Sequence, residues 1–272
     1  MASLLCPVCK NTLLKNEKSL SCDEGHNFDL ARQGYVNLMR GGGTKKGHGD
    51  DRLMVCARAA FLEGGHYDCL ANRVAELASG HVQDGDCVLD VGCGEGYYSC
   101  RVKQELERAG KRVDLCGVDI SREALIAFSR RTKDATLAVA SISSLPFESG
   151  SVNLLLNLFA PQSDEEFLRV LAPGGKLLCV FPLEEHLFGL KRAVYDVPYA
   201  NPAPDYAPAG FRLIHREDVR KTLVLDNTDD IQNLFTMTPY YYKTSRADQE
   251  KLRLLSHLET PLAFGIFLYE KI

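Results

Sequence analysis

The sequence contains no uninterrupted apolar run that approaches the roughly 20 residues a membrane-spanning helix requires. Residues 1–11 also lack the apolar core of a secretory signal peptide. The first absence predicts a protein without a membrane partner. The second predicts that it stays in the cytoplasm.

An excess of positive charge is missing as well, because 32 Lys and Arg face 36 Asp and Glu and give a net charge of −4. This balance argues against a general nucleic-acid-binding protein. The charge is unevenly distributed, however: residues 1–60 hold nine basic and six acidic side chains. We therefore expect any phosphate-facing surface in this N-terminal part, although a plain solvated surface explains the same excess.

A length of 272 residues suits one full α/β domain with a small additional module. The apolar fraction of 45% and the charged fraction of 25% are ordinary for a globular protein. Ten cysteines occur without an export signal. This combination favours reduced thiols and a metal site over a framework of disulfides.

Four potential metal ligands stand near the N-terminus in the pattern C-x2-C-x12-C-x3-H, formed by Cys6, Cys9, Cys22 and His26. Each close pair fits on one tight turn, and two such turns facing each other supply three thiolates and one imidazole, a closed set typical of structural zinc. The polar segment between the pairs is expected to form a small hairpin. So small a module needs the metal for much of its stability; unliganded thiols in a loop are the alternative.

A glycine-rich turn organises the rest of the chain. The apolar segment 87–91 includes Asp90 and is followed by Gly92, Gly94 and Gly96, after which residues 97–109 read as a helix. Strand, turn and helix in this order place the glycines against a ligand at the carboxyl edge of a parallel sheet. The spacing G-x-G-x-G differs from the dinucleotide pattern G-x-G-x-x-G. A β–α turn without a ligand is the alternative.

A second carboxylate, Asp119, closes the next apolar segment, 115–120. A carboxylate there accepts hydrogen bonds from both ribose hydroxyls, which favours adenosine with a sulfonium tail. With further strands expected at 137–140, 152–158 and 177–181, the region from about 67 to 182 resembles the class I S-adenosylmethionine-dependent methyltransferases. The resemblance implies an α/β, Rossmann-like, mostly parallel seven-stranded sheet. No acidic residue follows the third strand, so adenine is left to backbone groups, Ser141 or Ile142.

A narrower resemblance extends over nearly the whole chain. It rests on residues 6–9, 22–38, 58–67, 88–98 and 237–239, which include C-P-x-C, V-L-D-V-G-C-G-E-G-Y-Y and M-T-P. Together they resemble the bacterial large-subunit (23S) ribosomal RNA guanine-N1 methyltransferases of the RlmA type. That family implies a zinc module for RNA recognition, methyl transfer to N1 of a guanine in an RNA hairpin, and a homodimer.

The family pattern maps zinc ligation onto the four N-terminal ligands and cofactor contacts onto Tyr67, Gly94, Glu95 and His186. Packing of Tyr67 and a solvent-facing helical position for His186 are the alternatives. Together with the turn and strand-end residues, the predicted cofactor site consists of Tyr67, Asp90, Gly92, Gly94, Glu95, Gly96, Asp119, Ser141 and His186.

Three residues are candidates for contact with RNA. Phe159 follows the fourth strand and is placed to stack on an extruded base, since N1 of a stacked guanine is hidden. Packing beside Pro161 explains it equally well. Lys45 and Lys46 lie in a glycine-rich segment that is either a linker or a phosphate contact.

The sequence therefore predicts a zinc-binding RNA-recognition module (1–38), a linker and helix (39–66) and a methyltransferase domain (67–272). The expected activity is methyl transfer from S-adenosylmethionine to N1 of a guanine in large-subunit ribosomal RNA. A small-molecule methyltransferase of the quinone type and a non-catalytic, zinc-anchored RNA-binding protein are the alternatives. The base that accepts the guanine proton stays unassigned, with His186 and Glu184 as candidates.

Overall fold

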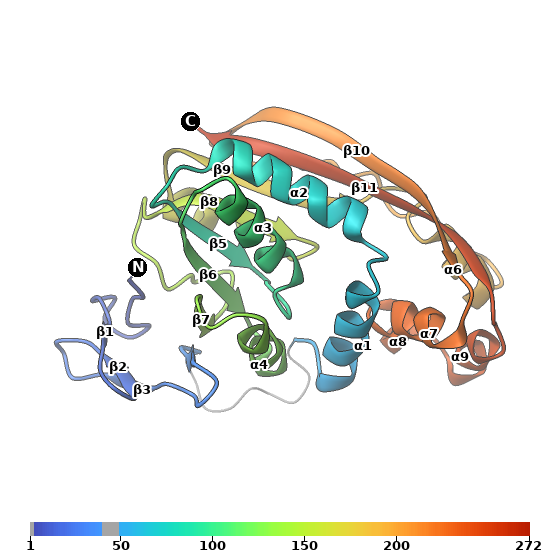
Figure 1. Cartoon of the computed structure of the whole chain (residues 1–272), viewed down its shortest axis with the longest axis horizontal. Coiled ribbons are helices and arrows are strands. Elements are labelled where there is room, and N and C mark those ends of the chain that lie inside the picture. The colour runs from blue at the N-terminus through green and yellow to red at the C-terminus, as the bar shows by residue number, and fades with distance from the viewer. Residues whose placement is uncertain (1–2, 40–48) are drawn as a thin grey trace.

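The computed structural model describes residues 3–39 and 49–272, and its centre is one large twisted sheet (Figure 1). Its strands lie in the order β10-β11-β9-β8-β5-β6-β7-β4, and only β11 runs antiparallel to its neighbours. The bounds are β4 (Tyr35–Asn37), β5 (Cys87–Val91), β6 (Asp114–Asp119), β7 (Thr136–Val139), β8 (Val152–Leu158), β9 (Leu171–Pro182), β10 (Phe211–Leu225) and β11 (Leu258–Lys271).

The central strands are buried on both faces, as the almost continuous apolar run of β8 illustrates. Parallel strands covered by helices on both sides carry such runs, because neither face meets water. The seven strands from β10 to β7 confirm the predicted Rossmann-like, mostly parallel sheet. Because β5 lies in the middle, the glycine turn that follows it opens at the centre of the carboxyl edge.

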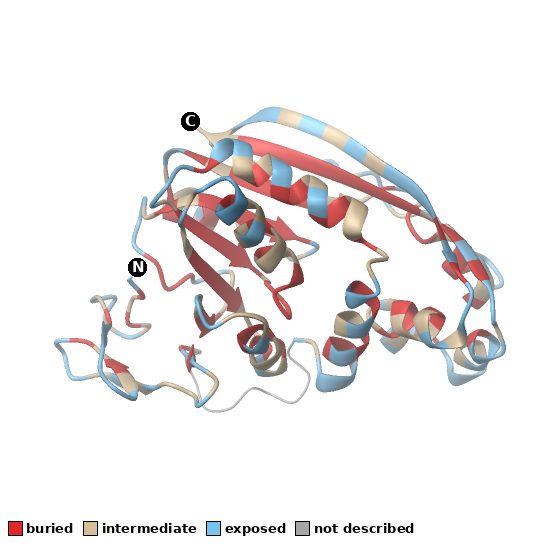
Figure 2. Ribbon diagram, in the orientation of Figure 1, coloured by how far each residue is buried: buried red, intermediate tan, exposed pale blue. Residues whose placement is uncertain are grey.

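Helices cover the sheet and extend beyond one end of it (Figure 1). One apolar cluster joins α2, α3 and α4 to one face, and a second joins α5 and the N-terminal module to the other. Helix α2 shows the expected division between a buried and an exposed side in Figure 2. The bounds are α1 (Arg52–Glu63), α2 (Asp68–His81), α3 (Tyr97–Arg108), α4 (Arg122–Arg131), α5 (Asp164–Val170), α6 (Phe188–Val194), α7 (Thr228–Thr236), α8 (Tyr240–Lys243) and α9 (Arg246–Arg253).

The N-terminal module contains a three-stranded antiparallel sheet of β1 (Leu14–Lys15), β2 (Ser19–Ser21) and β3 (Asn27–Asp29), and β1 with β2 forms the predicted hairpin. The module is docked on the large sheet. The backbone N–H of Leu5 donates to the carbonyl of Pro146 at 2.9 Å, and that of Leu38 donates to Val139 at 2.9 Å.

Strand β4 is the element that the sequence did not reveal as part of the large sheet. It pairs in parallel with β7 and places Tyr35 and Val36, both buried, in the apolar clusters of opposite faces. Without β4, the edge of β7 would present unpaired backbone groups to solvent, and a covered edge avoids that. The N-terminal module and the methyltransferase sheet therefore share one hydrogen-bonded edge.

The C-terminal strands are longer than predicted. In the sequence, residues 221–225 read as a strand, whereas β10 starts at Phe211 and pairs with β11 over its whole length, with one irregularity between Leu213 and His215. Its charged, exposed first half has no apolar pattern to mark it. Among the described residues, no helix is both long and apolar enough to cross a membrane.

Candidate functional site

The four predicted metal ligands come together in the N-terminal module. Their ligand atoms all lie within 4.8 Å of one another. The Sγ atoms of Cys9 and Cys22 are 3.5 Å apart, and Cys22 Sγ lies 3.4 Å from Nδ1 of His26. Zinc–sulfur bonds of about 2.3 Å in a tetrahedron separate two sulfurs by about 3.8 Å. Three thiols and one imidazole at these distances fit a structural zinc ion, with Cys6 as the remaining ligand.

Two tight turns hold these ligands, as the spacing predicts. The N–H of Lys10 donates to the carbonyl of Cys6 at 2.9 Å, and the N–H of Gly25 donates to that of Cys22 at 2.9 Å. Lys10 and Gly25 both have positive φ, which lets each turn close behind its cysteine. A zinc ion held by all four side chains would have no open position for catalysis, which fits a structural site.

The glycine turn after β5 has positive φ at Gly92, Gly94 and Gly96. A Cβ at Gly92 would lie 2.5 Å from Cβ of Ala160, and one at Gly96 would lie 2.2 Å from the Phe128 ring. Only glycine fits at these two positions, because any side chain would collide with Ala160 or with Phe128. At Gly94 the described residues place a single atom within 4 Å of such a Cβ, at 3.2 Å, so among them this glycine has more room beside it than the other two. That space fits a ligand lying across the turn.

Asp119 lies at the end of β6, next to the glycine turn, as predicted. Its Oδ2 accepts from the N–H of Gly94 at 2.9 Å, and its Oδ1 accepts from that of Ser121 at 2.7 Å. Burial raises the pKa of this carboxyl group. Each carboxylate oxygen has a second lone pair, so the fixed carboxylate can also accept from both hydroxyls of a ribose.

Asp90 and Glu95 are almost completely buried. Asp90 accepts from the Ser99 hydroxyl at 2.5 Å, and burial raises its pKa to about 7. Glu95 lies 3.8 Å from Arg58 and 4.0 Å from Arg131, and burial raises its pKa although both arginines oppose the shift. The Asp90 carboxyl is thus hydrogen-bonded to Ser99 within the protein, whereas Glu95 lies near two arginines beside the turn.

Burial of Asp90 predicts a pH-dependent stability. Its pKa is about 7 in the folded protein and about 4 in an unfolded chain. The unfolded chain releases the proton first as pH rises, so stability falls between these two values and stays lower above them. We expect Asp90→Asn to stabilise the protein at pH 8 by about 2–4 kcal/mol and to have little effect at pH 4. Urea unfolding of both proteins at each pH measures this, and equal differences at the two pH values would contradict it.

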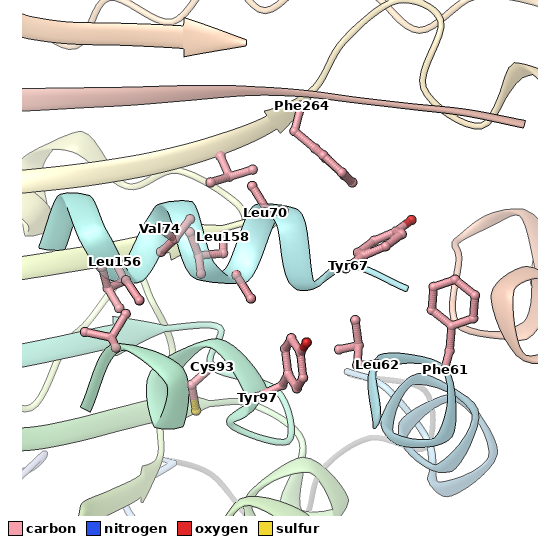
Figure 3. Packing of buried hydrophobic residues seen from close by; sticks show 14 of the residues in the cluster. Phe61, Leu62, Tyr67, Leu70, Val74, Cys93, Tyr97, Leu156, Leu158 and Phe264 are labelled. Carbon is pink, nitrogen blue, oxygen red and sulfur yellow. The ribbon is translucent and has the colours of Figure 1, made fainter. Parts of the chain in front are cut away.

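Tyr67 and His186 lie in a cluster of aromatic rings above the carboxyl edge of the sheet. The Tyr67 ring lies 5.3 Å from that of Phe61 and 5.0 Å from that of Phe264, and Figure 3 shows it between them. His186 lies 4.5 Å from the Phe264 ring and 6.2 Å from the Tyr67 ring. The fold therefore brings these two predicted cofactor residues together, although 119 positions separate them in the sequence.

His186 is buried, with 7% of its surface exposed, in the turn before α6. The solvent-facing alternative is thereby excluded. Burial lowers its pKa to about 3. Its Nδ1 accepts from the N–H of Ala263 at 3.3 Å, so the neutral ring carries its proton on Nε2 and acts there as a donor.

The remaining candidates lie at the rim. Ser141 follows β7 and its hydroxyl bonds with that of Ser143 at 2.8 Å. Phe159 is 43% exposed, has a φ of +62°, and holds its ring 5.8 Å from that of Phe264 and 6.2 Å from that of Tyr98. A left-handed conformation is costly for a phenylalanine and is typical of functional sites. Lys45 and Lys46, the other two RNA candidates, lie outside the described residues.

Arg58 is a residue of this site that the sequence analysis missed. It lies on α1, and its guanidinium pairs with Asp50 and faces Glu95 and Gly94. A signal was available, because Arg58 occupies the helical stripe that includes the buried residues Met54 and Phe61. A cation within a buried stripe needs anionic partners, which points to a charged site.

Comparison with known proteins agrees with this geometry. A family model described as "RlmA, N-terminal" matches residues 4–40, and one described as "Methyltransferase domain" matches residues 88–175. The 23S rRNA (guanine(748)-N(1))-methyltransferase of Streptomyces fradiae is 39% identical to this chain, covering 87% of it and 84% of that protein. YxjB of Bacillus subtilis (strain 168) is 35% identical, covering 94% of this chain and 91% of that protein.

Among solved structures, the YcgJ protein from Bacillus subtilis has a TM-score of 0.50 and 14% sequence identity, covering 73% of this chain and 97% of that chain. At this identity the likeness concerns the fold alone.

Proposed function

Because the chain belongs to the family of 23S ribosomal RNA guanine-N1 methyltransferases of the RlmA type, we propose that it transfers a methyl group from S-adenosylmethionine to N1 of a guanine in a hairpin of 23S ribosomal RNA. The observation that carries this proposal is the shared edge between the Cys₃His module and the methyltransferase sheet. A metal-stabilised recognition module fixed to a cofactor site suits a large, structured substrate.

The cofactor, when bound, supplies an activated methyl group on a sulfonium. The protein's contribution is to hold the cofactor and to align the guanine with it while water is excluded. Asp119 would hold the ribose hydroxyls, and Gly94 would give the cofactor room beside the turn. Tyr67 and the Nε2–H of His186 would contact its amino-acid end.

Guanine N1 carries a proton at neutral pH, which has to leave for the methyl group to bind. The pKa of about 3 and the occupied Nδ1 of His186 make this ring a poor proton acceptor. His186 therefore serves as a hydrogen-bond donor in this proposal, and no base is assigned.

The two alternatives explain less of the structure. A small-molecule methyltransferase does not need a Cys₃His module docked on the edge of its sheet. A non-catalytic RNA-binding protein does not need the open glycine turn beside Asp119. The proposed activity accounts for both features.

The proposal is tested by transfer of labelled methyl from S-adenosylmethionine to protein-free 23S ribosomal RNA from a strain that lacks the enzyme. Mass mapping of the modified fragment then locates the label. We expect the label on N1 of one hairpin guanine. Absence of label from the RNA, with cofactor binding intact, would overturn the proposal in favour of a small-molecule acceptor.

Phe159 is proposed to stack on the extruded guanine. Base–aromatic stacking contributes about 1–3 kcal/mol, so Phe159→Ala should lower kcat/KM for RNA about 5- to 100-fold while the Kd for S-adenosylhomocysteine stays unchanged. Phe159→Tyr keeps an aromatic face and should retain most activity. If both variants lost cofactor affinity instead, Phe159 would be a wall residue of the cofactor site.

Other parts of the proposal concern organisation and location. We propose that residues 1–38 form the RNA-recognition module, residues 39–66 a linker and helix, and residues 67–272 the catalytic domain, with large-subunit ribosomal RNA as the partner in the cytoplasm. We also propose the homodimer implied by the family. Light scattering of the purified protein distinguishes a dimer from a monomer.

A further inference from the structure

Arg58 extends from α1 toward the glycine turn and has only 21% of its side chain exposed. Its Nη2 pairs with the Asp50 carboxylate. Its Nη1 lies 3.8 Å from Oε2 of Glu95, beyond hydrogen-bonding distance. Within the described ranges, Nη1 and Nε of Arg58 donate no hydrogen bond. Two of the three guanidinium nitrogens, Nη1 and Nε, thus have N–H groups available for a ligand, although most of the side chain is buried.

These donors border the space beside the glycine turn. Arg58 Nη1 lies 3.2 Å from the position that a Cβ of Gly94 would take, and among the described residues it is the single atom within 4 Å of that position. Because the N–H of Gly94 donates to Asp119 at 2.9 Å, a ribose held by Asp119 would lie beside Gly94. The part of the ligand that follows the ribose therefore passes next to the guanidinium.

Charge indicates which group of the ligand belongs there. The methionyl end of S-adenosylmethionine carries a carboxylate, and a carboxylate removed from water requires a charged or strong hydrogen-bond partner. His186 cannot supply a charge, because burial keeps it neutral. Arg131 binds the carbonyl of Glu95 at 2.8 Å and its own partner Glu63, and so is already engaged.

Asp50 fixes Arg58 in place. The carbonyl of Asp50 accepts from the Ser121 hydroxyl at 2.6 Å, which ties this segment to the end of β6. Gly49 packs there so closely that a Cβ would lie 2.8 Å from Cγ2 of Ile120. The Asp50 carboxylate is thus anchored beside Asp119 and holds one edge of the guanidinium, leaving the other edge free.

We propose that the guanidinium of Arg58 binds the methionyl carboxylate of S-adenosylmethionine and that Asp50 is the positioning residue that holds it over Gly94. This inference rests on the proposed function only for the identity of the cofactor. A guanidinium suits the role because its planar donors match a carboxylate in a bidentate geometry.

The test compares two ligands by calorimetry. S-adenosylhomocysteine carries the amino-acid carboxylate, whereas 5′-methylthioadenosine keeps the adenosine and the sulfur but lacks the whole amino-acid part. We expect Arg58→Ala to weaken S-adenosylhomocysteine about 10- to 100-fold, as loss of a hydrogen bond to a charged group implies. It should change the Kd of 5′-methylthioadenosine less than twofold. Arg58→Lys should recover part of the loss.

The matched control is Arg101→Ala. Arg101 lies on α3 and pairs with Asp68 of α2 at 2.8 Å. This variant should leave both ligands unaffected. Equal weakening of both ligands by Arg58→Ala would show that Arg58 only closes the site, and no weakening of either would show that it lies outside; both results overturn the inference. Failure of the unaltered protein to bind S-adenosylhomocysteine would instead overturn the proposed function.

Discussion

Removal of the zinc ion, by chelation or by Cys22→Ser, is expected to abolish RNA methylation while S-adenosylhomocysteine still binds. Structural zinc contributes on the order of 10–16 kcal/mol in small zinc-dependent modules. The three short strands of this module cannot replace such a contribution, since they contain only a few buried side chains. Without the metal, we expect this module, the proposed RNA-recognition surface, to unfold. Methylation of 23S ribosomal RNA should fall by about 100-fold or more.

Cofactor binding should survive because the glycine turn follows β5 and Asp119 ends β6, and both strands lie in the middle of the large sheet. Metal analysis, RNA methylation and calorimetry on the same protein measure the three effects together. Cys56→Ser is the matched control, because Cys56 is an exposed thiol on α1. Full methylation of RNA by protein shown to be free of zinc would contradict the role assigned to the module.

The parts of the site that the sequence predicted well are held together by local chain geometry. Cys6 and Cys9 share one turn. Gly94 lies in the turn after β5, and Asp119 ends the neighbouring strand β6, so local spacing brings each pair close. Ser121, two positions after Asp119, caps α4 by accepting a hydrogen bond from the N–H of Ala124, which is likewise a local contact. Such relations need no knowledge of how distant segments pack.

The features that the sequence did not predict depend on contacts between distant segments. β4 joins the large sheet because β7, about a hundred residues later, offers an open edge. The burial of His186 depends on β11, which supplies Phe264 and the N–H of Ala263. The proximity of Arg58 to Glu95 arises only because α1 lies over the glycine turn in the folded protein. Helical periodicity places Arg58 in the buried stripe of α1, but it does not identify the distant residues that each of these segments contacts.

Gly96→Ala is expected to cost far more stability than Gly110→Ala, although both residues have nearly the same φ, +78° and +73°. A Cβ at Gly96 would lie 2.2 to 2.5 Å from three ring carbons of Phe128, whereas one at Gly110 meets nothing within 4 Å. The left-handed conformation costs about 1–2 kcal/mol in either variant. Overpacking adds about 1–3 kcal/mol at Gly96 alone.

Urea unfolding of the two variants measures the difference, which we expect to be about 1–3 kcal/mol. The fully buried Phe128 cannot move aside, because it also packs against Gly117, where a Cβ would lie 2.8 Å from the ring. Adding Phe128→Leu should therefore recover part of the loss in Gly96→Ala and none in Gly110→Ala. Equal costs for the two alanine variants would contradict this packing.

The contacts that a Cβ would make also assign different roles to the three glycines of the turn. Gly96 is required by Phe128 behind the turn and Gly92 by Ala160 beside it, so substitutions at either should lower stability. Among the described residues, only the guanidinium of Arg58 lies within 4 Å of a Cβ at Gly94, at 3.2 Å. Gly94→Ala should therefore lower stability by the left-handed cost of about 1–2 kcal/mol and, in addition, lower the affinity for S-adenosylhomocysteine. Close packing at Gly92 and Gly96 holds the turn in one conformation, while Gly94 has more room beside it for a ligand. A turn that is already rigid before binding lowers the entropic cost of binding.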